Sequence, residues 1–155
     1  MTEKINVRMS ECEMASGDVI LETLGLGSCV AICIYSKEKK LGGLAHIMLP
    51  HRINYEITEF RFADEAIFFM LKDFKKNGCE NKDLVAKIVG GASMFEGLSN
   101  HIGQDNVETI RAEFEKQGVK IAAEEVFGNH GRSIWFDLND GDVVVSTVYG
   151  ATVEI

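Results

Sequence analysis

The sequence predicts a single α+β domain built from mixed, mainly antiparallel strands with two flanking helices. Three observations lead to this class. Several short segments are rich in Val, Ile and Leu, two longer segments carry apolar residues at helical spacing, and the connections are too short for a consistently parallel sheet. With 155 residues, 46% of them hydrophobic, and no linker or repeat, residues 1–155 fit one compact domain.

The N-terminal third is expected to contain strands only. Residues 5–9 alternate between apolar and polar side chains, which is typical of a half-buried strand. Segments 18–24 and 29–35 are apolar, and Gly25 and Gly27 force a bend between them. The charged segment 36–40 (SKEKK) predicts a hairpin tip, and residues 42–49 are expected to form the returning strand.

The remaining residues are expected to form two helices and four strands. Helical spacing predicts a helix over 62–76 that stops near Gly78, with Phe68, Phe69 and Phe74 in the core. A second helix is expected over 104–117, with Gly118 at its end. Strands are expected over the four remaining apolar segments, 84–89, 119–125, 132–138 and 142–148.

The charge balance excludes some classes of partner. The formal net charge is −8 and the sequence pI is near 5.0, which argues against nucleic acid and anionic membrane surfaces as partners. No apolar run approaches the roughly 18 residues of a membrane span, and the first residues show no signal pattern. We therefore expect a soluble cytoplasmic protein without membrane insertion.

Neither metal nor nucleotide binding is expected. No two of the four cysteines form a CxxC pair. On an extended strand Cys29 and Cys33 would lie about 13 Å apart, too far to bind one metal ion together. The GLG at 25–27 lacks the third glycine of a dinucleotide-binding loop, because position 30 is Val. We expect no cofactor and no metal.

The segment 23–30 (TLGLGSCV) and His46 are the strongest candidates for chemistry. If the hairpin turn centres on residues 38 and 39, His46 faces Ala31, and Cys29 lies on the same face two residues away. A thiol beside an imidazole and behind a glycine bend suits a nucleophile with a general base, and the bend supplies N–H groups for an oxyanion. Such surroundings would lower the pKa of the thiol. Thr23, Ser28 and Ser93 could each orient the imidazole.

The same residues also have ordinary structural interpretations. A cysteine at the start of an apolar strand is commonly a small buried residue, and a histidine on an apolar strand is commonly part of the core. Cys12, Cys33 and Cys79 have no glycine bend or histidine at a useful spacing, and we expect them to be inert. We expect His51, His101 and His130 to be solvated.

Several blocks of the chain together resemble a known family. Residues 23–31 and 44–50 are similar to the active-site region of the chemoreceptor glutamine deamidases, the CheD family. The similarity continues through three further blocks in the same order, 86–95, 102–107 and 128–133.

The resemblance implies a cysteine hydrolase with a layered β-sandwich fold that converts glutamines of methyl-accepting chemotaxis receptors into glutamate. It implies that Cys29 is the nucleophile, His46 the base and Thr23 the residue that assists His46. It also implies a chemotaxis phosphatase of the CheC type as a partner. Asp105 and Phe127 depart from residues common in the family, which affects expectations on docking more than on chemistry. A non-catalytic adaptor, and a cysteine protease or transamidase, are the alternatives.

Overall fold

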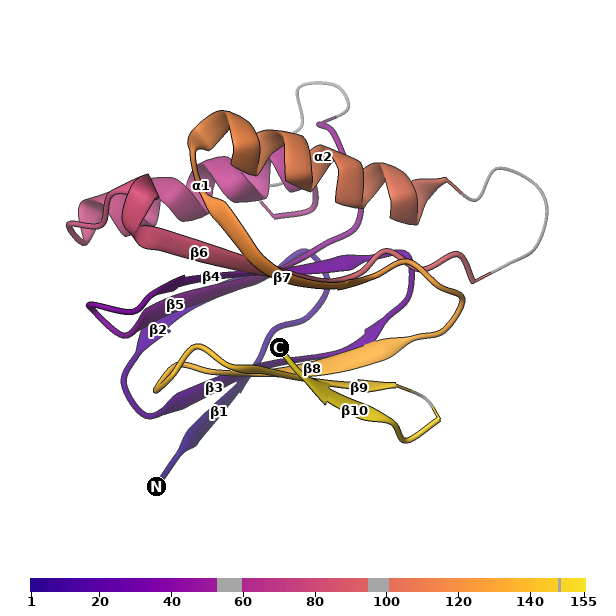
Figure 1. The fold of residues 1–155 in the computed structure, drawn as a ribbon, viewed down its shortest axis with the longest axis horizontal. Coiled ribbons are helices and arrows are strands. Elements are labelled where there is room, and N and C mark those ends of the chain that lie inside the picture. Colours follow the sequence, from indigo (N-terminus) through magenta and orange to yellow (C-terminus); the bar gives the residue numbers. More distant parts are fainter. Residues whose placement is uncertain (53–59, 95–100, 148) are drawn as a thin grey trace.

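The computed structural model describes residues 1–52, 60–94, 101–147 and 149–155. These residues form two five-stranded sheets that pack face to face, and two helices lie on the outer face of one of them (Figure 1). The sheet without helices has the order β1-β3-β8-β9-β10, and we call it the open sheet. The other has the order β2-β5-β4-β6-β7, and we call it the covered sheet.

Most strand pairs in both sheets are antiparallel, and only β1·β3 and β6·β7 are parallel among the pairs of the described residues. The open sheet consists of β1 (Glu3–Asn6), β3 (Val19–Leu26), β8 (Arg132–Asp137), β9 (Val143–Thr147) and β10 (Thr152–Glu154). The covered sheet consists of β2 (Cys12–Ser16), β5 (Leu41–Ile47), β4 (Val30–Ser36), β6 (Leu84–Gly90) and β7 (Lys120–Val126).

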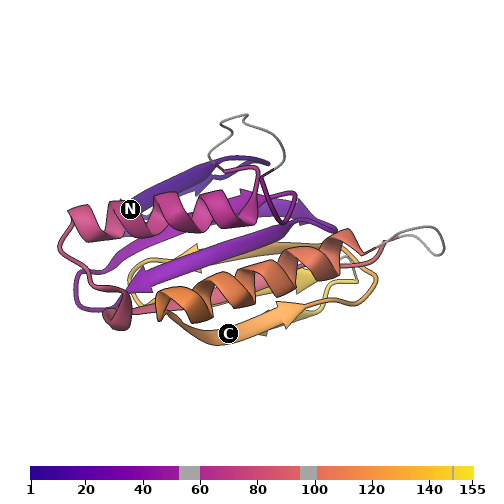
Figure 2. The same ribbon diagram turned by 90° about the horizontal axis from the view of Figure 1, so that it is seen from above.

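Both helices lie side by side across the covered sheet (Figure 2). Helix α1 spans Ala63–Lys76, α2 spans Ile102–Gln117, and a short 3₁₀ helix, η1, spans Asn81–Asp83. The apolar faces of α1 and α2 are buried against the covered sheet, as helical spacing requires. Helix α2 ends at Gly118, whose φ of 73° provides the left-handed conformation of a C-terminal cap.

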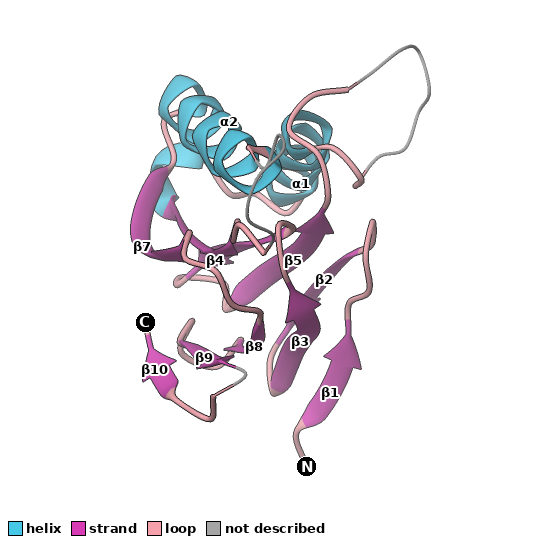
Figure 3. Cartoon of the chain, turned by 90° about the vertical axis from the view of Figure 1, so that its right-hand side faces the viewer, coloured by secondary structure: helices cyan, strands magenta, loops and turns pink. Residues whose placement is uncertain are grey.

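The three layers enclose two apolar cores, and the covered sheet separates them (Figure 3). Strand β4 is buried along its whole length and contributes to both. Ala31, Cys33 and Tyr35 pack into the core between the sheets, which we call the inter-sheet core. The alternating residues of β4 pack into the second core, between the covered sheet and the helices.

The predicted α+β class with a layered sandwich is confirmed, and both expected helices are present. Strands β2 and β10 were not expected. The prediction that Phe68 belongs to the core is wrong, because its position on the outer side of α1 leaves it 60% exposed. Two expectations concern residues outside the described ones: Val148 of the expected strand 142–148, and Phe95 of the block 86–95. No helix in the described ranges combines the length and hydropathy needed to cross a membrane.

Candidate active site

The β4–β5 hairpin brings Cys29 and His46 to one face of the covered sheet. The register pairs Ala31 with His46, as the hairpin length predicted. Cys29 lies two residues before Ala31, and its side chain packs against the inter-sheet core, which also contains Ala31. Residues in this diagonal relation have Cα atoms about 7–8 Å apart. The register and the packing therefore place the thiol and the imidazole on the same face of the covered sheet.

Thr23 reaches His46 from the opposite sheet. It lies on β3, is fully buried, and its Oγ1 is 2.7 Å from Nδ1 of His46. Of the three polar residues considered from the sequence, Thr23 is the one whose hydroxyl contacts the ring. Ser93 is exposed and Ser28 is partly exposed, and the described residues show no contact of either hydroxyl with His46.

The hydrogen bonds of Thr23 determine the tautomer of His46. The hydroxyl of Thr23 donates to the carbonyl of Val7 at 2.5 Å. A hydroxyl has one proton, so toward His46 its oxygen accepts, and Nδ1 must carry the hydrogen. Nε2 is then unprotonated. It is buried and has no hydrogen-bond partner among the described residues, so its lone pair is free on a ring that shares a face of the covered sheet with Cys29.

Burial keeps both members of the candidate pair neutral. Desolvation lowers the pKa of His46 from 6.5 to about 4, because the site disfavours the imidazolium. Desolvation also raises the pKa of the Cys29 thiol above its ordinary value. The sequence-based expectation of a lowered thiol pKa is thus wrong for the free protein. It underestimated how far two packed sheets remove water from this position.

Residues at the end of β6 and directly after it fix the backbone of the Cys29 loop. The N–H of Gly91 donates to the carbonyl of Cys29 and that of Ala92 to the carbonyl of Gly27, both at 2.9 Å. Gly90 has a φ of 120°, and a Cβ there would lie 2.3 Å from the carbonyl oxygen of Cys29. Only glycine permits this approach. Among the described residues, the N–H groups of Ser28 and Cys29 donate to no main-chain carbonyl.

Asn106 of α2 also contacts this loop, and the sequence analysis did not find it. It is fully buried, and its Nδ2 donates to the carbonyls of Ser28 and Met48, each at 3.0 Å. One signal was available. Asn106 lies at helical spacing from Gly103 and Ile110, so the expected helix placed an amide on its buried face.

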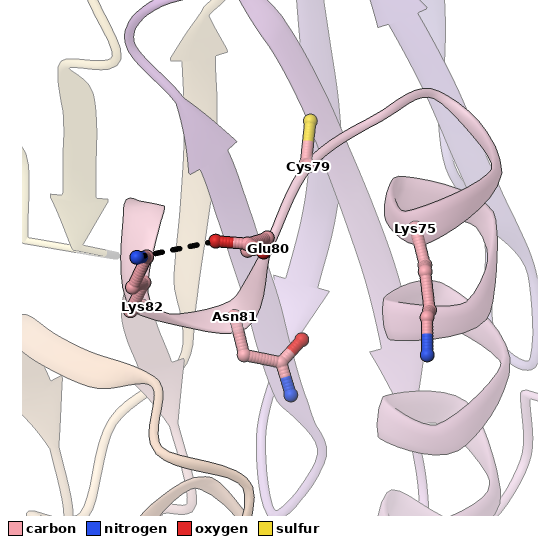
Figure 4. A pocket seen from close by; sticks show the side chains of 5 residues that line it. All are labelled: Lys75, Cys79, Glu80, Asn81 and Lys82. Atoms are coloured by element: carbon pink, nitrogen blue, oxygen red, sulfur yellow. Dashed lines mark ion pairs between the residues drawn. The ribbon is translucent and has the colours of Figure 1, made fainter.

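The remaining cysteines lie apart from this arrangement. Burial raises the pKa of Cys12 to about 12, and Cys33 and Cys79 are buried. Cys79 borders a hollow of about 430 Å³ at the end of α1, where Lys82 forms an ion pair with Glu80 at 3.3 Å (Figure 4). That hollow contains none of the candidate catalytic residues.

The remaining histidines are also separate from the site. The side chain of His51 is 68% exposed and lies 3.7 Å from a carboxylate oxygen of Asp64, while His101 is exposed and His130 is partly exposed. Within the described ranges, no three His, Cys, Asp or Glu side chains gather as metal ligands would.

Comparisons with known proteins are consistent along the chain. Residues 48–147 match the family model described as "CheD chemotactic sensory transduction". A "Probable chemoreceptor glutamine deamidase CheD" of Archaeoglobus fulgidus is 37% identical and covers 100% of both chains. Proteins of the same name from Desulforamulus reducens and Clostridium botulinum are 39% and 35% identical. The first covers 94% of this chain and 91% of its own, and the second covers 98% of each.

Among solved structures, the hypothetical protein YfiH of Bacillus licheniformis aligns with a TM-score of 0.49 at 14% identity. The alignment covers 74% of this chain and 49% of that one. The family-model match begins after Thr23, Cys29 and His46, whereas the match to the Archaeoglobus protein extends over the whole chain and so spans those three positions.

Proposed function

Because this chain belongs to the CheD family, we propose that it deamidates glutamine side chains of chemoreceptors to glutamate and releases ammonia. The names of the relatives support the substrate class. The observation that carries the chemistry is the hydrogen-bonded chain from Val7 through Thr23 to His46, which leaves Nε2 free on the face shared with Cys29. We assign Cys29 as nucleophile, His46 as base and Thr23 as the residue that orients His46.

The first half of the proposed reaction forms a thioester. As Sγ of Cys29 bonds to the carboxamide carbon, its proton passes to Nε2 of His46, and the carbonyl π pair moves onto oxygen. Because burial favours the neutral form of both groups in the free protein, we propose that this transfer accompanies the attack rather than preceding it. When the carbonyl re-forms, the C–N bond breaks, and the proton on Nε2 passes to the leaving nitrogen, which departs as ammonia.

The second half returns the enzyme to its starting state. Water attacks the thioester carbon and gives a proton to Nε2, and the C–S bond then breaks. The proton returns to sulfur, and the product is a glutamate side chain. The sum is glutamine and water converted to glutamate and ammonia. Each proton transfer uses Nε2, so Nδ1 must keep its hydrogen throughout. Thr23 Oγ1 holds that hydrogen in place by accepting a hydrogen bond from Nδ1.

The arrangement also supports one deamidase domain over residues 1–155, because Thr23 and His46 come from opposite sheets. We place the reaction in the cytoplasm, on the cytoplasmic part of the receptors. The sequence resemblance supports a phosphatase of the CheC type as a binding partner. Co-elution of the two purified proteins in size-exclusion chromatography would support it, and separate elution at micromolar concentrations would contradict it.

The experiment is incubation of a chemoreceptor cytoplasmic fragment with wild-type protein, Cys29→Ala and Cys33→Ala. Ammonia release and site-resolved mass spectrometry of the fragment are measured. Cys33 lies on β4, four residues after Cys29, and packs against the same inter-sheet core but is buried, so it is the matched control. We expect Cys29→Ala to abolish deamidation and Cys33→Ala to retain it. Deamidation by folded Cys29→Ala would refute the proposed chemistry, and cleavage of the fragment would indicate a protease.

A further inference from the structure

Asn106 makes two hydrogen bonds that do not belong to any regular element. Its amide nitrogen donates to the carbonyl oxygens of Ser28 and Met48. Both partners are acceptors only, so the NH₂ group must face them and the amide orientation is unambiguous. One partner directly precedes Cys29, and the other lies two residues after His46.

These bonds lie where the β4–β5 ladder ends. The last pair in the register is Val30 with Ile47, so Ser28 and Met48 lie beyond it on diverging segments. Asn106 reaches them from α2, whose neighbouring Val107 packs into the core on the helix side of the covered sheet. The amide therefore joins the two segments from the side opposite to the inter-sheet core.

The contact with Ser28 determines the direction of the next N–H. In a planar trans peptide, the C=O of one residue and the N–H of the next point in opposite directions. The Ser28 carbonyl points toward α2, so the Cys29 N–H points away from α2. The Cys29 side chain lies on that side, because it packs against the inter-sheet core. In agreement, this N–H lies near its own sulfur and moderates the rise in the pKa of the thiol.

We propose that Asn106 is a positioning residue that aims the N–H of Cys29 at the oxyanion formed on the substrate carboxamide. This inference rests on the proposed deamidation. As Sγ bonds to carbon and the thiol proton passes to His46, the oxygen gains the electron pair, and the Cys29 N–H donates a hydrogen bond to it. The N–H keeps its own proton. It donates to no main-chain carbonyl among the described residues, so no backbone bond has to break before it donates to the developing charge.

The two ends of the Asn106 amide differ in what they contribute. Its Oδ1 is buried and has no hydrogen-bond partner in the described part of the chain. A buried acceptor without a partner is unfavourable for folding. An aliphatic side chain of similar size would avoid this cost but would leave the carbonyls of Ser28 and Met48 without their donor, so the benefit of Asn106 lies in the two segments that its nitrogen joins.

The test compares wild type, Asn106→Leu, Asn106→Ser and, as a matched control, Thr109→Val. Thr109 is also buried on α2 but its hydroxyl lies 3.3 Å from the ring of His51, away from Cys29. Two rates are measured for each protein. One is ammonia release from a chemoreceptor fragment, resolved into kcat and KM, and the other is alkylation of Cys29 by iodoacetamide, followed by peptide mass spectrometry. Alkylation uses the same sulfur but forms no oxyanion.

We expect kcat of the Asn106 variants to fall by about 10²-fold, as for a lost oxyanion donor, while KM and the alkylation rate stay within about threefold. Thr109→Val should match wild type in both rates. Three outcomes would overturn the inference on Asn106 and leave the proposed function standing. They are an unchanged kcat, an equal fall of kcat and of the alkylation rate, and failure of both Asn106 variants to fold. If wild type is alkylated but releases no ammonia, the proposed function falls, and this inference with it.

Discussion

His46 combines burial, neutrality and one unsatisfied nitrogen, and these properties depend on one another. It is 2% exposed, and its Nδ1 is held by Thr23 while Nε2 has no partner among the described residues. A charged imidazole would lose its hydration here without gaining a carboxylate, so the neutral ring is favoured. A neutral ring can accept a proton, which the proposed mechanism requires. The same environment makes the folded protein sensitive to acid.

We expect the acid sensitivity of His46 to be measurable as stability. Its pKa is about 4 in the folded protein against 6.5 in the unfolded chain, so between these values only the unfolded chain binds the proton. Stability is therefore fully present above pH 6.5 and is lost as the pH falls toward 4. Between pH 7 and pH 5, the free energy of unfolding should fall by about 2 kcal/mol more in wild type than in His46→Asn. Urea unfolding at both pH values tests this, and equal losses in the two proteins would contradict it.

Thr23 should matter through the tautomer it imposes. Thr23→Val keeps the shape of the side chain but removes the acceptor for Nδ1–H, so the hydrogen can move to Nε2 and block the base. We expect kcat for ammonia release to fall on the order of 10²-fold, the contribution of a general base. Thr23→Ser retains the hydroxyl and should keep most of the activity. Wild-type kcat in a folded Thr23→Val protein would show that the hydroxyl does not control the ring.

At the scale of elements, the hairpin shows why part of the site could be predicted. The charged tip at 36–40 fixes the centre of the turn, and strict alternation then fixes which side chains share a face. Cys29 and His46 follow from these local rules. Thr23 comes from another sheet, and the residues alone left it open among three polar candidates. Its selection rested on the family resemblance.

The parts that sequence analysis missed depend on long-range packing. Strands β2 and β10 are short edge strands without clear alternation, and β2 forms because β5 offers it a partner. The raised pKa of Cys29 depends on how closely the two sheets exclude water, which no local pattern encodes. The role of Asn106 required knowing that α2 lies over the ends of β4 and β5.

We expect that no side chain fits at Gly103, where the first turn of α2 packs on the residues that hold the Cys29 loop. A Cβ at Gly103 would lie 2.6 Å from the carbonyl oxygens of Gly91 and Ala92, which are backbone atoms that cannot rotate away. Gly103→Ala should therefore displace the helix or the loop and lower the free energy of unfolding by about 1–3 kcal/mol. Because Gly91 holds the carbonyl of Cys29, ammonia release should fall as well.

The neighbouring position provides the control for that variant. Gln104 is exposed in the same turn of α2, so Gln104→Ala should change the free energy of unfolding little. Denaturant unfolding and ammonia release are measured for both variants. If Gly103→Ala is as stable and active as Gln104→Ala, the close approach of helix and loop does not constrain the site.

For the whole molecule, polar bonds between the two sheets lie at separate places around the inter-sheet core. Thr23 and His46 form one such link near Cys29. Lys87 of β6 forms another, because its Nζ donates to the main-chain oxygens of Gly141 at 2.9 Å and Ile155 at 2.7 Å. The first link serves the proposed chemistry, and the second joins the covered sheet to the β8–β9 turn and the end of the open sheet. Stability and activity should therefore be separable.

Lys87→Met tests that separation. Methionine keeps most of the aliphatic stem but removes two charge-assisted hydrogen bonds, and we expect the free energy of unfolding to fall by about 2–3 kcal/mol. Lys87 pairs in register with Cys33, which lies about 13 Å along β4 from Cys29, so kcat at temperatures well below unfolding should not change. Lys120→Met, at an exposed position on the adjacent strand β7, is the matched control and should alter neither property. If Lys87→Met lost kcat while remaining folded, the two sheets would be coupled through the whole core, and the site would depend on their relative placement rather than on the Thr23–His46 contact alone.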